Sequence, residues 1–479
     1  MLFPVRRSPP CAMKRLTITI AMLVAGAVAA PAAHASSQQL LVMQDDAQVR
    51  SAPDTTLDEF ADLGADVVKL NLYWDEVAPK GRHKPSGFNG ADPAGYAWGS
   101  YDTAVAAILA HGMQPYLSLG GHAPAWATHG RGRPGTMRPS AKEFHLFAQA
   151  AGQHYPGVHI WSIWNEPNLD SWLGPQRSRG TVLSPSIYRG LYLAGYRGLD
   201  DAGHRGDTVL LGELMPRGGT SPSKVRPLEF LREMTCLDRN YHQIRGRAAK
   251  KRGCRKIGRF PTSGIAYHPY TPPAGPHVAE GRDDAAIGQL SRLRSTIDAL
   301  ARRGKLPRHL PIWITEFGYQ TKPPDPLQGA PLKRAAAFMD ESEWIAFRNP
   351  RVASYSQYTL LDDPPRPGSG PLRWSSWQAG LHFRNGKKKP YVYDAFRLPV
   401  FVRTVSANRV EIFGGRRSLT GGTAQIESKA PGASYRPLGS AEVNRSGYFR
   451  RVLKVNGAAR RKYRVTLDGI TRVKSPVTR

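Results

Sequence analysis

The feature that most constrains this chain is a regular alternation between short apolar runs and longer segments with a helical pattern, which extends from Leu40 to Leu398. Apolar runs bounded by turn residues predict buried strands, and strands that alternate with helices predict parallel pairing through crossover connections. We identify eight such runs, at 40–44, 65–73, 113–121, 158–164, 208–214, 263–268, 311–317 and 352–358.

The segments between the apolar runs are expected to form helices. They are 101–111, 141–154, 185–202, 283–303 and 332–347, and several open with Ser, Asp or Pro, which favour the first turn of a helix. Eight strands with intervening helices predict an α/β fold, a (β/α)8 or TIM barrel. A doubly wound sheet is the alternative, but no glycine-rich phosphate turn follows the first strand.

Beyond Pro399 the pattern changes to short segments that alternate polar and apolar residues between Gly, Asn and Ser turns. Such alternation is typical of half-buried strands, so a small all-β, sandwich-like domain is predicted to follow the barrel. The expected domains are therefore residues 36–399 for the barrel and 400–479 for an accessory β domain.

The N-terminus has the pattern of a signal peptide. Lys14 and Arg15 precede an apolar run over 16–30, and small residues follow up to Ala35. We expect cleavage after residue 35, with translation from Met1 or from Met13, and a secreted product that is extracellular or associated with the cell envelope. A membrane anchor is the alternative, but the run is short for a bilayer span, and no later segment is apolar enough for one.

Removal of residues 1–35 would leave two cysteines, Cys236 and Cys254. In an exported chain they are expected to form one structural disulfide. No Cys/His cluster has the spacing of metal ligands, so no metal site is predicted.

The chain carries 67 Lys and Arg against 37 Asp and Glu, a formal net charge of +30. The positive residues are scattered and are not interleaved with aromatic residues, so no nucleic acid is expected as a partner. We expect instead a basic surface that associates electrostatically with anionic polymers of the cell envelope.

Two acidic residues, Glu166 and Glu316, end the fourth and seventh apolar runs, within "WNEP" and "ITEFG". In a barrel the carboxyl ends of the strands meet at one mouth, so the two side chains are expected to share a cleft. Two carboxyl groups on either side of a glycosidic bond can divide its cleavage between them, one as proton donor and the other as nucleophile. Either residue alone could equally cap a helix or pair with an arginine.

These two motifs resemble those of clan A glycoside hydrolases, such as families 5 and 39, which have a (β/α)8 barrel. The resemblance implies that Glu166 is the acid/base, that Glu316 is the nucleophile and that Asn165 donates to the sugar 2-hydroxyl. It also implies retention of anomeric configuration.

Further substrate-binding residues follow from weaker similarities. "AYHPYT" places His268 or Tyr270 beside Glu316, and "GGHAPAWA" is similar to a turn of family 39 in which His122 and Trp126 would line the sugar site. Core packing is the alternative explanation for each of these residues. Near the mouth, we expect sugar-stacking surfaces from Trp74 and Trp377.

Two positions depart from the clan pattern. Lys69 lies where many members place an arginine near the nucleophile, and a lysine cannot donate through a planar fork. The tryptophan at the end of the eighth strand is replaced by Gln357 and Tyr358.

The sequence thus predicts a secreted retaining glycoside hydrolase that acts on a polysaccharide or oligosaccharide by double displacement. It would need no cofactor, because two carboxyl groups supply the chemistry, and we expect a monomer. The alternative is a non-catalytic glycan-binding or cell-envelope-associated protein on a hydrolase-like barrel. Loss of hydrolysis without loss of glycan binding in Glu316→Gln would distinguish the two.

Overall fold

The computed structural model describes residues 39–477, except 130–131, 219–220, 255–256 and 279. The predicted signal peptide, residues 1–35, lies outside the described residues.

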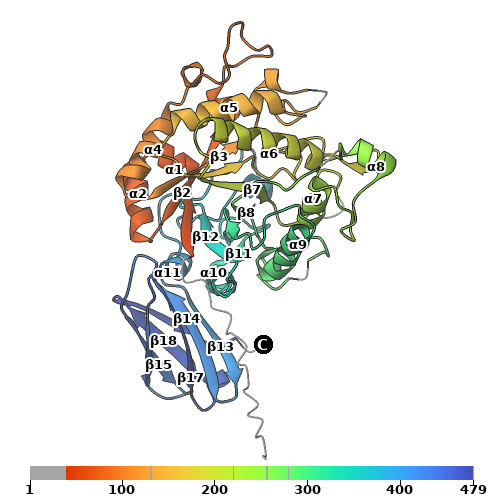
Figure 1. Ribbon diagram of the computed structural model, residues 1–479. Coiled ribbons are helices and arrows are strands. Elements are labelled where there is room, and N and C mark those ends of the chain that lie inside the picture. Colours follow the sequence, from red (N-terminus) through yellow and green to blue (C-terminus); the bar gives the residue numbers. More distant parts are fainter. Residues whose placement is uncertain (1–38, 130–131, 219–220, 255–256, 279, 478–479) are drawn as a thin grey trace, which may run out of the picture. The chain divides into compact units, whose positions relative to one another are not determined.

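A closed barrel of eight parallel strands forms the larger part of the described chain (Figure 1). The strands pair in the order β1, β12, β9, β8, β7, β4, β3, β2, and β2 pairs with β1. They are β1 (Leu40–Gln44), β2 (Val67–Tyr73), β3 (Gln114–Gly120), β4 (Ile160–Ile163), β7 (Thr208–Leu214), β8 (Gly264–Tyr267), β9 (Ile312–Ile314) and β12 (Val352–Tyr358). All eight predicted strands and the barrel are confirmed.

Side-chain alternation along the strands separates two cores. The barrel interior holds a buried cluster with one member from most strands: Val42, Val67, Tyr116, Ile160, Leu210, Ala266 and Trp313. A much larger cluster lies between the strands and the surrounding helices. Because successive side chains point to opposite faces, Lys69 extends into the same interior as Val67, and Ser162 into the same interior as Ile160.

Helices surround the barrel, and five of them match the five segments expected from the sequence. They include α1 (Asp46–Ser51), α2 (Pro53–Asp62), α3 (Trp74–Val77), α4 (Ser100–Ala110), α5 (Ala141–His154), α6 (Ser184–Asp201), α7 (Pro227–Met234), α8 (Gly246–Lys251), α9 (Leu290–Arg302), α10 (Leu332–Phe347) and α11 (Val392–Arg397). The helix predicted from residue 283 begins later, at Leu290. Asp283 and Asp284 instead bind the side chains of Arg232 and Arg226, which holds that stretch in a loop.

Two antiparallel sheets follow the barrel, as predicted. One contains β13 (Val400–Ser406), β14 (Arg409–Gly415) and β17 (Tyr448–Lys454), and the other contains β16 (Arg436–Glu442), β15 (Thr423–Lys429), β18 (Lys462–Leu467) and β19 (Ile470–Lys474). They enclose a core of their own, which includes Ile412, Ile426 and Val465. The described residues, 39–477, belong to one compact unit, so the domain boundary at residue 399 stays a prediction.

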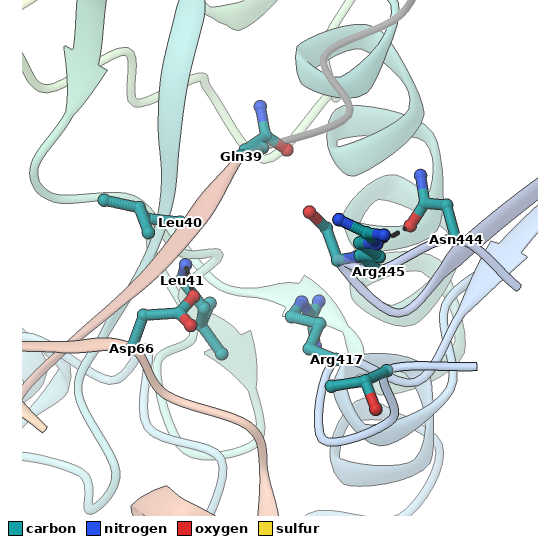
Figure 2. Close-up of a pocket in the computed structure, with 9 residues that line it drawn as sticks. Gln39, Leu40, Leu41, Asp66, Arg417, Asn444 and Arg445 are labelled. Carbon is teal, nitrogen blue, oxygen red and sulfur yellow. Dashed lines mark hydrogen bonds between the residues drawn. The ribbon is translucent and has the colours of Figure 1, made fainter. Parts of the chain in front are cut away.

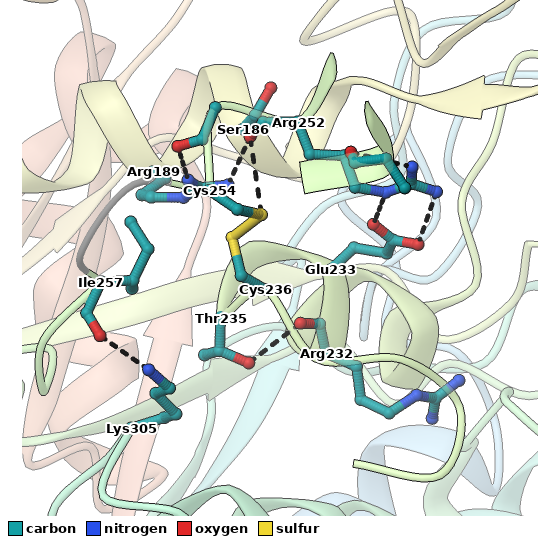
Figure 3. Close-up of a disulfide and its surroundings, with 12 residues drawn as sticks. Ser186, Arg189, Arg232, Glu233, Thr235, Cys236, Arg252, Cys254, Ile257 and Lys305 are labelled. Atoms are coloured by element: carbon teal, nitrogen blue, oxygen red, sulfur yellow. Dashed lines mark hydrogen bonds and ion pairs between the residues drawn. A yellow bond between two sulfur atoms is a disulfide. The ribbon is translucent and has the colours of Figure 1, made fainter. Parts of the chain in front are cut away.

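The predicted disulfide is present between Cys236 and Cys254, with 5.7 Å between their Cα atoms (Figure 3). It joins the residues that follow α7 to those that follow α8. An ion pair between Arg252 and Glu233, at 2.6 Å, lies beside it. Within the part of the chain that the structure describes, no helix combines the length and apolar character that a bilayer crossing requires.

Candidate active site

The carboxyl ends of four neighbouring strands bring acidic and basic side chains together. Glu166 lies three residues beyond β4, Glu316 two beyond β9, and His268 directly beyond β8, while Glu213 is the sixth residue of β7. Glu166 and Glu213 have φ angles of 36° and 58°, in the left-handed region that non-glycine residues rarely adopt. Such backbone strain persists only where the surroundings impose it, and it is concentrated at functional sites.

His268 connects the two glutamates singled out from the sequence. Its Nδ1 lies 3.0 Å from Oε1 of Glu166 and 3.4 Å from Oε2 of Glu316. Those two oxygens are therefore at most 6.4 Å apart, the sum of the two distances. The structure thus brings together two residues that are 150 positions apart in the chain.

Glu316 is surrounded by hydrogen-bond donors. The ammonium of Lys69 lies 2.9 Å from Oε1, and the hydroxyl of Tyr270 donates to Oε2 at 3.2 Å. Lys69 therefore contacts the predicted nucleophile, although as a single cation and not as a fork. Its Nζ is also 2.9 Å from Oε2 of Glu213, so it bridges two carboxylates.

Glu213, in the fifth of the predicted strands, is a further central member of the site. Its buried carboxylate accepts hydrogen bonds from Tyr116 and from Ser162, the latter at 2.6 Å. Burial alone would raise the pKa of Glu213, but Lys69, His268 and the Ser162 hydroxyl outweigh burial and hold that pKa well below its usual range. Glu213 is therefore a permanent negative charge within the barrel.

The two cations of the site are held in their charged forms by these carboxylates. Burial would lower the pKa of His268, but Glu316, Glu166 and Glu213 together raise it to about 9. Burial likewise opposes the charge of Lys69, and Glu213 and Glu316 overcome this and raise its pKa. At neutral pH the imidazole of His268 is therefore an imidazolium.

Asn165 lies beside Glu213. With its amide oriented to satisfy both ends, the nitrogen donates to Oε2 of Glu213 at 3.0 Å and the oxygen accepts from the indole of Trp172 at 3.2 Å. The side chain is buried. Its predicted contact with a sugar hydroxyl stays a prediction.

A cavity of about 540 Å³ opens at Glu166 and is lined by Tyr270, Trp377, Arg217 and Lys224, among others. Trp377 stacks on Tyr270 with 4.8 Å between ring centroids, and the ring of Tyr358 meets it edge-on at 6.0 Å. The indole of Trp377 is 37% exposed. Two of the predicted binding residues, Tyr270 and Trp377, therefore line the cavity that contains the predicted acid/base.

A second cavity, of about 420 Å³, is lined by His122, Asp75, Lys80 and Arg133. His122 stacks on Trp172 at 5.3 Å, and its Nε2 donates to the carbonyl of Ser171 at 2.9 Å. The indole of Trp172 also donates to Asn165, whose amide donates to Glu213. A chain of side-chain contacts therefore leads from His122, at this cavity, to Glu213.

The expectation for Trp74 is corrected. Its side chain is fully buried, stacks on Phe147 at 5.5 Å and belongs to the core between strands and helices. It has no surface for a sugar, because it begins α3 and turns toward that core. Trp126 packs edge-on against Trp74 and donates to the carbonyl of Pro79, so its role in sugar binding stays a prediction.

Two further places have some features of a binding site. A cavity of about 570 Å³ lies at Gln39, Leu41, Asp66 and Arg417 (Figure 2), but it is at the amino ends of β1 and β2, away from the glutamates. Glu213, His268 and Glu316 are close enough to hold a metal ion, but the ammonium of Lys69 already bridges the two carboxylates.

Comparison with known proteins supports the fold assignment. No protein-family model matches the chain. Beta-glucosidase 47 of Arabidopsis thaliana is 30% identical over 121 residues, which is 25% of this chain and only 21% of that protein.

Two solved structures are similar over most of their length. They are a family 39 glycoside hydrolase from Bacteroides cellulosilyticus WH2 (TM-score 0.52, 14% identity, 91% of this chain and 82% of that one) and a glucosidase from Croceicoccus marinus (TM-score 0.51, 12% identity, 89% and 96%). At such low identity the likeness concerns the fold. The chain has a glycoside hydrolase-like fold, an eight-stranded parallel barrel.

Proposed function

We propose that this protein is a retaining O-glycoside hydrolase, with Glu166 as acid/base and Glu316 as nucleophile. The observation that carries the proposal is the approach of these two carboxyl groups to one imidazole, with facing oxygens no more than 6.4 Å apart. Retaining enzymes place their carboxyl groups about 5–5.5 Å apart, whereas inverting enzymes leave about 6.5–9.5 Å for a water molecule. A separation of at most 6.4 Å between these oxygens is compatible with direct attack by Glu316, and the product anomers decide between the two mechanisms.

The reaction has two steps. In the first, an oxygen of Glu316 bonds to the anomeric carbon while Glu166 transfers its proton to the departing glycosidic oxygen. In the second, Glu166 removes a proton from water, the water oxygen attacks the same carbon, and the bond to Glu316 breaks. The donors around Glu316, Lys69 and Tyr270, are suited to a carboxylate that is negative before and after the cycle.

The exposure of the three carboxyl groups supports these roles. Glu213 is fully buried and Glu316 nearly so, whereas Glu166 is the most exposed of the three and lines the open cavity. Glu166 is therefore the carboxyl group that a departing sugar oxygen can reach, as an acid/base requires.

The surroundings support a carbohydrate substrate. Trp377 and Tyr270 offer stacked aromatic rings beside Glu166, and aromatic walls with a few placed polar groups are typical of ligand sites. The cavities at Trp377 and at His122 would accept sugar units on two sides of the scissile bond, which favours an oligosaccharide or polysaccharide. Export is supported by the N-terminal pattern and by the disulfide.

The test is a screen of β-linked aryl glycosides and of plant and bacterial wall polymers, with product anomers followed by NMR. We expect hydrolysis with retained configuration. Glu316→Gln should lower kcat by several orders of magnitude, and added azide should restore activity in Glu166→Ala on aryl glycosides with good leaving groups, because a small anion can replace water in the second step. Inverted products would refute the assignment of Glu316.

A matched control is Glu143→Gln, which changes a glutamate that pairs with Lys84 at 2.7 Å outside the barrel mouth. It should leave hydrolysis unchanged. If wild-type protein binds glycans in the screen but cleaves none of them, the non-catalytic glycan-binding alternative replaces the hydrolase proposal.

A further inference from the structure

The amino ends of two neighbouring barrel strands carry a second cluster of charged and imidazole side chains. His159 directly precedes β4 and Asp207 directly precedes β7, and the amide of Thr208 donates to the carbonyl of His159 at 3.0 Å. His204 lies three residues before Asp207. The cluster therefore lies beside the first backbone hydrogen bond between β4 and β7, at the end of the barrel opposite the glutamates.

The three side chains converge on one point. Nδ1 of His159 is 3.0 Å from Oδ1 of Asp207, and Nδ1 of His204 is 2.6 Å from Oδ2. One ligand atom from each residue lies within 4.8 Å of the other two. Two imidazole nitrogens and a carboxylate are a ligand set that zinc accepts.

The surroundings of His204 point to a cation. Its Nε2 lies 3.0 Å from the carbonyl of Gly152 and its Nδ1 faces the carboxylate of Asp207, so both ring nitrogens face acceptors. A neutral imidazole has one N–H and can satisfy only one of them. A cation bound at Nδ1 would leave the single N–H at Nε2 for the carbonyl of Gly152. A backbone carbonyl that fixes the second nitrogen is also the usual outer contact of a zinc-bound histidine.

We propose that His159, His204 and Asp207 form a zinc site, with a water molecule as the fourth ligand. His204 is 5% exposed and fixed, whereas the His159 side chain is 65% exposed and leaves an open path for the ion. The site joins β4 to β7 at the amino-end face, where barrels carry stability rather than catalysis. The bound ion would link these two strands, and the inference does not rest on the hydrolase proposal.

The first experiment is titration of metal-free, untagged protein with Zn²⁺ by isothermal calorimetry. We expect one ion per chain at this site, and His159→Ala should weaken that binding about tenfold or more. His159 is the variant of choice because its exposed side chain can be removed with little effect on packing. The melting temperature should rise with Zn²⁺ in the wild type but not in this variant.

The matched control is His154→Ala. His154 also contacts an aspartate, Asp102 at 2.8 Å, but belongs to no group of three ligands among the described residues. Its loss should leave zinc binding intact.

A second measurement identifies the ligands. Co²⁺ in place of Zn²⁺ should give the visible absorption of a four-coordinate site in the wild type and in His154→Ala, and lose it in His159→Ala. Equal Zn²⁺ binding by wild type and His159→Ala would overturn the proposal, as would wild-type protein that binds no Zn²⁺.

Discussion

The substitution Lys69→Met tests whether the buried charges of the candidate site depend on one another. The ammonium of Lys69 lies 2.9 Å from a carboxylate oxygen of Glu213 and 2.9 Å from one of Glu316, with little or no exposed surface on any of the three. At an effective dielectric constant of 20, each pair attracts by about 6 kcal/mol before the loss of hydration is subtracted. Removal of one partner of a buried ion pair lowers the free energy of unfolding by about 3–5 kcal/mol.

The double substitution Lys69→Met/Glu213→Gln should be less destabilising than the sum of its parts. Glu213→Gln removes one of the carboxylates that Lys69→Met leaves without its cation, while the amide still accepts from Ser162 and Tyr116. We expect a coupling energy of about 1–3 kcal/mol, the range for residues that share a charge network.

Urea unfolding followed by tryptophan fluorescence measures all four proteins of the cycle and needs no substrate. Lys84→Met is the matched control, because Lys84 contacts Glu143 at 2.7 Å but is partly exposed, and exposed pairs contribute at most about 1 kcal/mol. If Lys69→Met is no more destabilising than Lys84→Met, or if the two active-site substitutions are additive, the charge network described above is refuted.

Three further predictions follow from the same structure. Replacement of Cys236 and Cys254 by serine opens a link across 18 residues and should lower the free energy of unfolding by about 3 kcal/mol, seen as a lower urea midpoint. Trp377→Ala removes the exposed ring stacked on Tyr270 and should raise KM for glycosides more than it lowers kcat, with a loss in stability of only about 1 kcal/mol. A lower kcat with an unchanged KM would contradict a binding role. The pKa of His268 is about 9 in the folded protein against about 6.5 in the unfolded chain. Charged His268 should therefore add on the order of 3 kcal/mol to the free energy of unfolding below pH 6.5, and this contribution should be lost as the pH rises through 9. A wild-type free energy of unfolding that does not change over that window, or the same slope in His268→Asn, would exclude this contribution.

The sequence was sufficient for the barrel and for its two glutamates. Eight apolar runs with intervening helices leave few other architectures, and the ends of parallel strands meet at one mouth whatever the loop lengths. That topological rule placed Glu166 and Glu316 together without any knowledge of contacts. The disulfide followed from the small number of cysteines.

Side-chain direction explains the wrong expectation for Trp74. Trp74 follows the last residue of β2, and alternation along that strand, which points Leu70 and Leu72 toward the helices, carries the indole into the same outer core. In the cluster of His159, His204 and Asp207, the last two are three positions apart in the chain, but only the pairing of β4 with β7 brings His159 to them, and sequence spacing does not show that.

Glu213 shows why alternation can also mislead inside a strand. Leu210 points into the barrel and Leu211 toward the helices, so simple alternation would direct Gly212 inward and Glu213 outward. The pairing of β7 with β8 shifts between Gly212 and Leu214, and this bulge turns Glu213 into the interior.

The bulge requires an unusual backbone conformation at Gly212 and Glu213, and it buries a charged side chain. Gly212 has a φ of 120°, and a Cβ atom there would lie 2.6 Å from the carbonyl oxygen of Ala266, so no larger residue fits without displacement of the neighbouring strand. Glu213 itself adopts the left-handed region, at an energy of roughly 1–3 kcal/mol. An apolar residue in a regular strand would avoid both this strain and the burial of a charge. In return, the inward carboxylate contacts both Lys69 and His268 and helps to keep the two cations charged beside Glu316.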